Sequence, residues 1–219
     1  MESHFEDRHA AGRLLAGVLH VYAGRSDLVV LALPRGGVPV GYEVAKALGA
    51  EFDVLIVRKL GLPHHPELAM GAIASGGAID LNRNVIAMSG VTQRDIEGVL
   101  AQEYRELTRR EALYRGARPA ARIEGRTVIV VDDGIATGAS MRAALKALRT
   151  RKPAKIIVAV PVAPIDTRER LQDVADEFVC VLSPADFQAV GQFYRNFDQT
   201  SDDEVRTLLA KFDSTGALK

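Results

Sequence analysis

Two neighbouring carboxylates, Asp132 and Asp133, stand at the end of an apolar run that begins at residue 127. Like charges at the end of a buried strand repel each other, so both side chains need polar partners. Carboxylates only accept hydrogen bonds, and the vicinal hydroxyls of a sugar are natural donors to such a pair. The pair therefore indicates a site for a sugar diol.

A loop of small residues follows the acid pair and leads into a predicted helix. Its backbone N–H groups, its hydroxyls and the helix N-terminus can point inward together, which suits a phosphate dianion. The acid pair and this cradle in one run fit a ribose 5-phosphate. For the glycine-rich part alone, the alternative is a strand–turn–helix in which Ser or Thr only caps the helix. The loop residues are Gly134, Thr137, Gly138, Ala139 and Ser140.

Alternating apolar patterns describe the elements that must position this loop. Short, continuous apolar runs predict strands buried on both faces, and 3.6-residue spacing predicts helices between them. The alternation predicts an α/β fold in which a twisted parallel sheet carries helices on both faces. The expected strands are 28–34, 53–57, 127–133, 155–162 and 178–182. The expected helices are 6–22, 39–48, 92–117 and about 166–174, one that contains Met141, Leu145 and Leu148, and a last one that contains Val205 and Phe212.

Three segments start where predicted strands end, and ligands of such sheets bind at those ends. They are residues 34–38, 58–82 and 132–140. Segment 58–82 is rich in Gly, Pro and small residues, and it is expected to form a long excursion with a short hairpin around Gly76 and Gly77. Long loops in compact domains are usually functional or mobile, so this segment is a candidate for a role in the site.

The composition limits the class of protein. A chain of 219 residues suits one domain, and 28 basic against 28 acidic residues argue against a uniformly basic nucleic-acid binder. The single cysteine, Cys180, excludes an internal disulfide and a cysteine zinc cluster, and it favours a reducing, cytoplasmic location. The N-terminus has no signal-peptide pattern, and no apolar run approaches the roughly 20 residues that cross a bilayer. The arginine-rich stretch 105–126 has interspersed Glu and is expected to be a solvated face or a dimer edge.

The run VVDDGIATGAS resembles the motif with which type I phosphoribosyltransferases bind 5-phosphoribosyl diphosphate (PRPP). That motif consists of hydrophobic residues, two acids and a Gly/Thr loop, and it is highly specific. The resemblance covers residues 28–165 well, and it is most pronounced to bacterial members that share the pattern LPRGG…RKLG…ELAMGA. It implies one type I phosphoribosyltransferase-like domain over residues 1–219. The implied parts are a core at about 24–182, a flexible flap at about 58–82 and a small hood at about 183–219, with the N-terminus as a further candidate for the hood.

The resemblance carries specific roles onto the acid pair and the small-residue loop. Asp132 and Asp133 would bind the 2- and 3-hydroxyls of the ribose of PRPP, and Ala136 to Ser140 would hold its 5-phosphate. The implied reaction displaces diphosphate from C1 of the ribose by a nitrogen acceptor, through a state with oxocarbenium character. Asp132 would either stabilise the developing positive charge or act as a base toward the acceptor, and the sequence does not separate these roles.

Two further motifs match the family's diphosphate site. Arg35, Gly36 and Gly37 of LPRGGVPVG would wrap the leaving diphosphate, in a loop that often contains a non-proline cis peptide in this family. Arg58 and Lys59 would reach the diphosphate from the end of the second strand, and Arg35 and Lys59 would stabilise it as it leaves. Mg²⁺ carried by the diphosphate, with no dedicated protein ligand, would be the cofactor. Taken alone, RGG is compatible with a turn before a helix, and Arg58-Lys59 with a solvated strand end.

The flap and the hood supply the remaining candidates. The loop from 60 to 76 would close over the reaction and exclude water, and it contains His64, His65 and Glu67, which form only a weak metal pattern. The hood faintly resembles that of hypoxanthine phosphoribosyltransferases, but it lacks the lysine that precedes the fifth strand in that group. Its aromatic side chains could stack on a planar acceptor or pack under the last helix. These aromatic residues are Phe187, Phe193, Tyr194 and Phe197.

The sequence thus favours an enzyme of nucleotide metabolism, a Mg²⁺-dependent glycosyltransferase that moves a 5-phosphoribosyl group from PRPP to a nitrogen acceptor such as a nucleobase. The alternative is a non-catalytic protein that senses PRPP or a nucleotide, for which a helix-turn-helix or a basic face would be expected. A third possibility is a catalytic remnant that needs a partner. Lys59 and the full flap favour the enzyme. No membrane partner is expected, and the net charge of zero argues against a nucleic-acid partner. A homodimer like those of the family is a further expectation.

Overall fold

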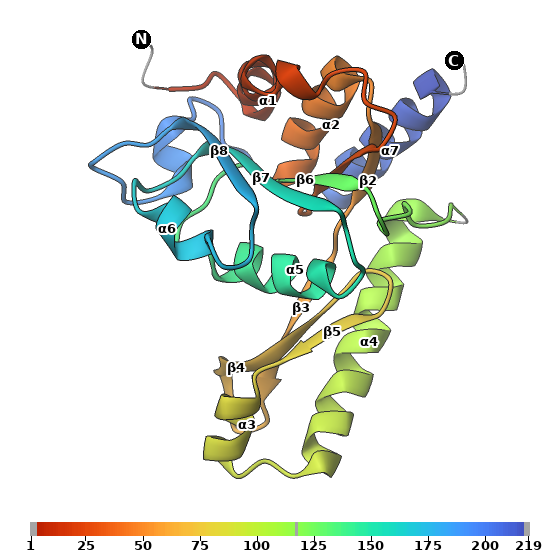
Figure 1. Cartoon of the computed structure of the whole chain (residues 1–219), viewed down its shortest axis with the longest axis vertical. Coiled ribbons are helices and arrows are strands. Elements are labelled where there is room, and N and C mark those ends of the chain that lie inside the picture. The colour runs from red at the N-terminus through yellow and green to blue at the C-terminus, as the bar shows by residue number, and fades with distance from the viewer. Residues whose placement is uncertain (1–3, 117, 217–219) are drawn as a thin grey trace.

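Figure 1 shows the computed structural model of the chain, which describes residues 4–116 and 118–216. Five parallel strands form the central sheet in the order β2-β1-β6-β7-β8. Every residue of β1 and β6 is buried, because helices cover both faces of the sheet. This confirms the predicted parallel α/β sheet. The strands are β1 (Leu28–Ala32), β2 (Glu51–Val54), β6 (Thr127–Val131), β7 (Lys155–Val162) and β8 (Glu177–Leu182).

Helices cover the two faces of this sheet unequally. One face carries α1 (Arg8–Val18), α2 (Gly37–Leu48) and α7 (Asp202–Gly216), and the other carries α5 (Ala139–Arg149) and α6 (Thr167–Leu171) (Figure 1). Alternate residues of a strand point to opposite faces, so Val30 of β1 lies in the core with α2 whereas Val29 lies in the core with α5. The sheet therefore separates two apolar cores and leaves its carboxyl edge to loops.

Two helices differ from the predicted boundaries for local reasons. The first spans Arg8–Val18 instead of 6–22, because the side chain of Asp7 accepts a hydrogen bond from the backbone N–H of Ala10 and caps it. A short 3-10 turn, η1 (His20–Tyr22), takes up the rest of the apolar pattern. The second begins at Gly37, so the loop after β1 is two residues shorter than Pro39 suggests.

The second strand of the sheet is residues 51–54, and the predicted range 53–57 is wrong. The apolar run continues through Leu55 and Ile56, but the pairing of β1 with β2 ends at Ala32 and Val54. The remainder of the run leaves the central sheet and enters a second sheet at Val57. One apolar run thus serves two sheets, which its pattern alone does not reveal.

An extension below the central sheet in Figure 1, which we call the arm (residues 57–115), contains a three-stranded antiparallel sheet and two helices. The predicted hairpin around Gly76 and Gly77 is confirmed, because both glycines have positive φ and join two antiparallel strands. The predicted loop over residues 60–76 is wrong, since most of this segment forms regular strands. The elements are β3 (Val57–Leu62), β4 (His65–Ala74), β5 (Ala78–Leu81), α3 (Arg83–Ser89) and α4 (Gln93–Arg115).

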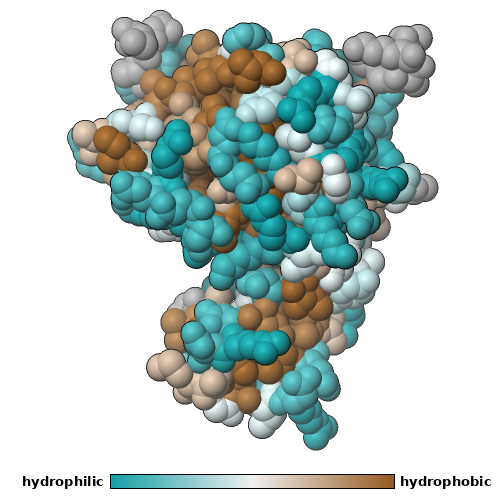
Figure 2. All heavy atoms as spheres, in the orientation of Figure 1, coloured by the Kyte–Doolittle hydropathy of each residue, from teal (hydrophilic) through white to brown (hydrophobic). Residues whose placement is uncertain are grey.

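The arm has a buried side and an exposed side. Leu60, Met70 and Ile73 are fully buried where β3 and β4 pack against α4. Glycine, proline and small residues separate these three buried residues in the sequence. The strand pattern can therefore be recognised only when the packing against α4 is known. Apolar atoms gather on the lower part of the molecule in Figure 2, which the arm forms. Its exposed large apolar side chains are Leu68, Ile79, Leu81, Met88 and Tyr104.

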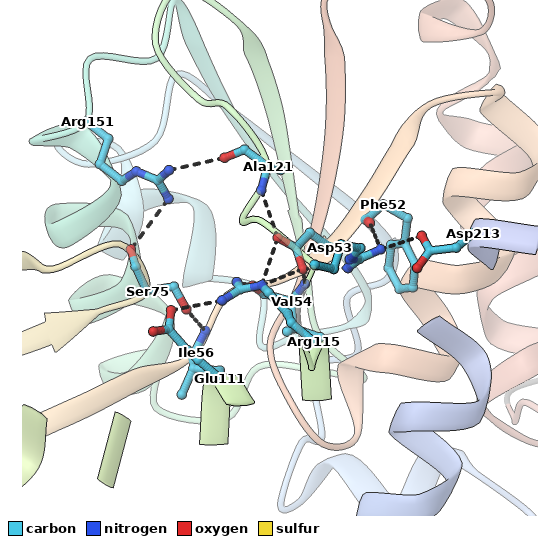
Figure 3. A network of polar contacts seen from close by, with 11 residues as sticks. Phe52, Asp53, Val54, Ile56, Ser75, Glu111, Arg115, Ala121, Arg151 and Asp213 are labelled. Atoms are coloured by element: carbon cyan, nitrogen blue, oxygen red, sulfur yellow. Dashed lines mark hydrogen bonds and ion pairs between the residues drawn. The ribbon is translucent and has the colours of Figure 1, made fainter. Parts of the chain in front are cut away.

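A buried ion pair joins the arm to the central sheet (Figure 3). Arg115 is the last residue of α4, and its Nε lies 2.9 and 3.0 Å from the two carboxylate oxygens of Asp53 in β2. The same carboxylate accepts hydrogen bonds from Nη2 of Arg118 at 2.8 Å and from the backbone N–H of Ala121 at 3.0 Å. The arginine-rich stretch 105–126 is therefore not simply the solvated face or dimer edge that was expected.

The N-terminal residues pair with the segment after β8. The backbone N–H of Phe5 donates to the carbonyl of Phe193 at 2.7 Å, and the N–H of Arg195 donates to the carbonyl of Phe5 at 2.9 Å. Phe5, Phe193 and Tyr194 are buried together against Val162 of β7. We call residues 183–198, which include the 3-10 turn η2 (Val190–Phe193), the hood segment. Within the described part of the chain, no helix is long and apolar enough to span a bilayer.

Candidate active site

The acid pair lies at the carboxyl edge of the central sheet. Asp132 and Asp133 directly follow β6, and the neighbouring strand β1 ends beside them, with the backbone N–H of Leu33 donating to the carbonyl of Val131 at 2.9 Å. The loop after β1 and the loop after β6 are therefore adjacent, although about a hundred residues separate them in the sequence.

Two glycines bring these loops into direct contact. A Cβ atom on Gly36 would lie 2.1 Å from Oδ2 of Asp133, and one on Gly37 would lie 2.8 Å from the carbonyl oxygen of Val131 and 2.9 Å from Cα of Asp132. Only glycine allows the backbone to approach the acid pair this closely. The peptide bond between Pro34 and Arg35 in the same loop is cis, as the family resemblance implies.

The small-residue loop opens onto the N-terminus of α5. Gly138 has φ +77° and precedes the first helical residue, Ala139, and the Oγ1 of Thr137 accepts only a long hydrogen bond of 3.4 Å from the N–H of Ala139. Ala136, Thr137, Ala139 and Ser140 are exposed. The start of an eleven-residue helix thus faces solvent next to the acid pair, an arrangement that favours an anion.

Gly134 has a different place from the rest of that loop. It is buried, and a Cβ atom there would lie 2.5 Å from Cγ1 of Val190 in the hood segment. The next residue is fixed as well, because the N–H of Ile135 donates to the carbonyl of Val162 at 3.0 Å. The geometry gives Gly134 a packing role, in which it lets the hood segment sit directly on the acid-pair loop.

The two acids have different environments. Oδ1 of Asp132 accepts a hydrogen bond from the N–H of Asp133 at 2.9 Å, while loss of solvation and the neighbouring carboxylate raise the pKa of Asp132 well above its usual range. Loss of solvation also raises the pKa of Asp133, and the guanidinium of Arg8, whose Nε lies 2.8 Å from Oδ2, opposes that shift. A ligand that donates hydrogen bonds would favour the ionised pair.

The predicted cations are spread over a wider region. Arg35 lies in the loop after β1, and its Nη1 is 3.8 Å from Oδ1 of Asp202 at the start of α7. Arg58 and Lys59 are not at the end of a central strand, as predicted, but in β3 of the arm. Neighbours in a strand face opposite sides, and Arg58 faces α4, where its Nε donates to Glu103 at 2.7 Å. Lys59 is exposed.

The aromatic candidates of the hood segment lie beside α1 and not under the last helix. Phe193 and Tyr194 are 7% and 6% exposed, and their rings pack against Phe187 and Phe5 respectively. Phe197 is 37% exposed, and its ring carries the guanidinium of Arg8 at 4.0 Å. Of the four, Phe187 and Phe197 therefore retain the more accessible rings.

The sequence interpretation missed Arg8, which binds the carboxylate of Asp133 from α1. It named Tyr194 only as a ring that could stack on the acceptor, whereas the hydroxyl of Tyr194 donates to the backbone carbonyl of Asp133 at 2.6 Å. Arg8 and Asp133 are 125 residues apart, and neither contact leaves a local signal in the sequence.

His64 and His65 are exposed at the turn between β3 and β4, far along the arm, and the side chain of Glu67 lies outside what the structure describes. Among the described residues, no group of three or more His, Cys, Asp or Glu side chains is arranged to hold a metal ion.

Comparison with known proteins places the chain in a family. Residues 5–197 match the family model described as the phosphoribosyl transferase domain. Relatives from two strains of Mycobacterium tuberculosis, both named as phosphoribosyl transferases, are 47% identical in an alignment 218 residues long that covers 98% of this chain. The chain spans about half (49%) of the length of these curated relatives. The crystal structure of TT1426 from Thermus thermophilus is 44% identical with a TM-score of 0.84, over 95% of this chain and 99% of that chain. Together with the acid pair and its adjoining loops, these matches show that the chain belongs to the phosphoribosyl transferase domain family.

Proposed function

We propose that the chain transfers a 5-phosphoribosyl group from PRPP to a nitrogen acceptor and releases diphosphate, with a nucleobase as the favoured acceptor. The close packing of Gly36 and Gly37 on the acid pair carries this proposal. It puts a loop suited to diphosphate against carboxylates suited to ribose hydroxyls, beside the open N-terminus of α5. Three groups of one molecule of PRPP would meet three adjacent parts of the site.

In the proposed reaction, the bond between C1 of the ribose and the diphosphate oxygen breaks, and a bond between C1 and the acceptor nitrogen forms. Positive charge develops on the sugar, and the carboxylates of Asp132 and Asp133, bound to the ribose hydroxyls, would stabilise that charge. Backbone N–H groups of the loop at Gly36 and Gly37, together with the guanidinium of Arg35, would bind the departing diphosphate. The proton of the acceptor nitrogen leaves to a carboxylate or to water.

Mg²⁺ fits this site as a metal carried by the substrate. The loop that would meet the diphosphate offers backbone N–H groups and Arg35, which are donors, so the hard oxygen ligands that Mg²⁺ prefers would come from the diphosphate and water. When bound, the ion would neutralise charge on the leaving group. Lys59 lies in β3 of the arm, and it would help to neutralise the charge of the diphosphate only if the arm brings it toward the loop at Gly36 and Gly37.

The acceptor side of the site is proposed to lie at the hood segment. Phe187 and Phe197 have the more accessible rings, and a planar base could stack on Phe187 or meet the exposed edge of Phe197, whose ring carries the guanidinium of Arg8. Phe193 and Tyr194 would support these rings from beneath, because both are buried against them.

The proposal is tested by titrating the full chain with PRPP in the presence of Mg²⁺ and then measuring diphosphate release across purines, pyrimidines and amines. We expect saturable binding of PRPP that depends on Mg²⁺, and release of diphosphate with at least one planar nitrogen acceptor. Absence of PRPP binding would contradict the proposal. Binding without release for any acceptor would instead support a PRPP or nucleotide sensor.

Replacing Gly36 with alanine is expected to lower kcat/KM for PRPP by about a hundredfold, because an ångström-scale displacement at a reacting site has effects of that size. The added Cβ would overlap Oδ2 of Asp133 at 2.1 Å, so either the loop or the carboxylate must move. Gly17→Ala is the matched control, since a Cβ there meets nothing within 4 Å. Steady-state kinetics on both variants checks the prediction, and equal effects of the two substitutions would contradict it.

A further inference from the structure

Arg8 contacts the acid pair from an element that the family motifs do not include. Its Nε lies 2.8 Å from Oδ2 of Asp133, its Nη1 donates to the backbone carbonyl of Asp198 at 2.6 Å, and its guanidinium stacks 4.0 Å from the centre of the Phe197 ring. The side chain of Arg8 is only 11% exposed. The carbonyl of Asp198 and the ring of Phe197 thus hold the guanidinium against one oxygen of Asp133, and the side chain of Arg8 has little freedom to move.

The backbone around Arg8 is fixed as firmly as its side chain. Asp7 caps α1 immediately before it, and the carbonyl of Glu6 accepts a hydrogen bond from the N–H of Asn196 at 3.0 Å. The hydroxyl of Tyr194 meanwhile holds the backbone carbonyl of Asp133 at 2.6 Å. The start of α1 and the hood segment therefore hold Asp133 from its side chain and its backbone at once.

Among the described residues, Arg8 is the side chain that donates to the Asp133 carboxylate, and it meets Oδ2, the oxygen that also points toward Gly36. The side chain of Asp133 is 15% exposed, so part of its carboxylate remains open to a hydroxyl donor.

We propose that Arg8 is a positioning residue: it holds Oδ2 of Asp133 toward the loop at Gly36 and so presents the other oxygen to a ribose hydroxyl. The inference rests on the proposed function for the identity of the sugar ligand. It assigns to α1 a part in the site that the motifs at 33–41 and 128–140 do not contain. The opposite interpretation, in which Arg8 competes with the sugar for Asp133, predicts the opposite effect on binding.

The charge of Arg8 has a second consequence for the same carboxylate. The titratable and charged groups that face Asp133 are Arg8 of α1, Asp132 of the same loop and Tyr194 of the hood segment, with Cys180 of β8 beyond the tyrosine. Burial and the neighbouring carboxylate of Asp132 disfavour ionisation of Asp133, whereas the positive charge of Arg8 favours it. Without Arg8, a larger share of Asp133 would be protonated, and a neutral carboxyl group accepts a weaker hydrogen bond from a hydroxyl than a carboxylate does.

The test compares Arg8→Gln, Arg8→Lys and the matched control Arg13→Gln, whose arginine is on the same helix, 61% exposed, and 3.8 Å from Glu43. The first readout needs no ligand: the pH titration of the Asp133 carboxyl carbon by NMR, assigned with Asp133→Asn. In Arg8→Gln we expect the midpoint to rise by about one unit or more, since loss of an adjacent opposite charge has effects of this size. Arg8→Lys should restore part of the shift, and Arg13→Gln should cause none.

The second readout is PRPP affinity as a function of pH. Arg8→Gln is expected to bind PRPP about tenfold more weakly near pH 7, because one charge-assisted hydrogen bond no longer orients the carboxylate. Its affinity should also begin to fall at a higher pH than that of the wild type. Tighter binding by Arg8→Gln, or an unmoved Asp133 midpoint, would overturn the inference. If the wild type itself binds no PRPP, the proposed function fails, and the ligand-free titration still decides the role of Arg8.

Discussion

Replacing Asp53 with alanine is expected to lower the free energy of unfolding by about 3–5 kcal/mol, the cost of removing one partner from a buried ion pair. Asp53 and Arg115 are 3% and 5% exposed at their side chains, and Nε of Arg115 contacts both carboxylate oxygens. Without the carboxylate, the Arg115 guanidinium stays buried, and among the described residues it keeps Glu111 and the carbonyl of Val54 as partners. The backbone N–H of Ala121 also loses its acceptor.

Asp213→Ala is the matched control for this prediction. Asp213 also pairs with Arg118, but its side chain is 48% exposed, so its removal should cost no more than about 1 kcal/mol. Urea unfolding of both variants measures the difference directly. A loss of less than about 1 kcal/mol in Asp53→Ala would mean that Arg115 finds another partner, and that the arm does not depend on this anchor.

The doubly substituted variant Asp53→Ala, Arg115→Ala adds a test of the cause. If the buried, uncompensated cation is responsible for most of the loss, removing it should recover part of the stability that Asp53→Ala alone loses. Simple addition of the two single effects would instead indicate that packing around Asp53 matters more than charge.

Four of the five strands of the central sheet could be predicted because each is a continuous apolar run that no other element shares. Residues 155–162 form β7 with the predicted boundaries. Prediction was wrong where one run is divided between two structures, as at residues 53–57, because the point of division is set by where β1 ends. It was also wrong for residues 60–76, whose strands depend on α4 for an apolar partner.

Within the candidate site, contiguous sequence was informative and distant contacts were not. The acid pair, the small-residue loop and the glycines at 36 and 37 each belong to a short motif, and the fold brings them together as expected of adjacent strand ends. Arg8 and Asp53 belong to no motif. An arginine near the start of a helix and an aspartate in an apolar run acquire their roles only from partners many residues away.

Replacing Asp132 with asparagine is expected to weaken PRPP binding by about a hundredfold or more, because charge-assisted hydrogen bonds to the ribose hydroxyls become ordinary ones. The same holds for Asp133→Asn, which also releases Arg8. Asp203→Asn, at a side chain that is 88% exposed on α7, is the control. Calorimetric titration with PRPP and Mg²⁺ measures all three, and full affinity in both acid-pair variants would contradict the site.

The free energy of unfolding shows whether Asp132→Asn loses PRPP affinity because it loses its fold. Affinity is expected to fall in this variant, whereas stability near pH 7 is expected to stay the same or rise. The pKa of Asp132 is raised in the folded protein, so the folded state keeps its proton at pH values where the unfolded chain has released it. The contribution of Asp132 to stability is therefore fully present below the pKa of an unfolded aspartate, about 3.9, and it is lost as pH rises through the raised value. Near pH 7 the variant Asp132→Asn should be at least as stable as the wild type toward urea, and its advantage should shrink as the pH is lowered. A variant that is markedly less stable than the wild type near pH 7 would show that the acid pair holds the loop together, and that its burial serves the fold instead of a ligand.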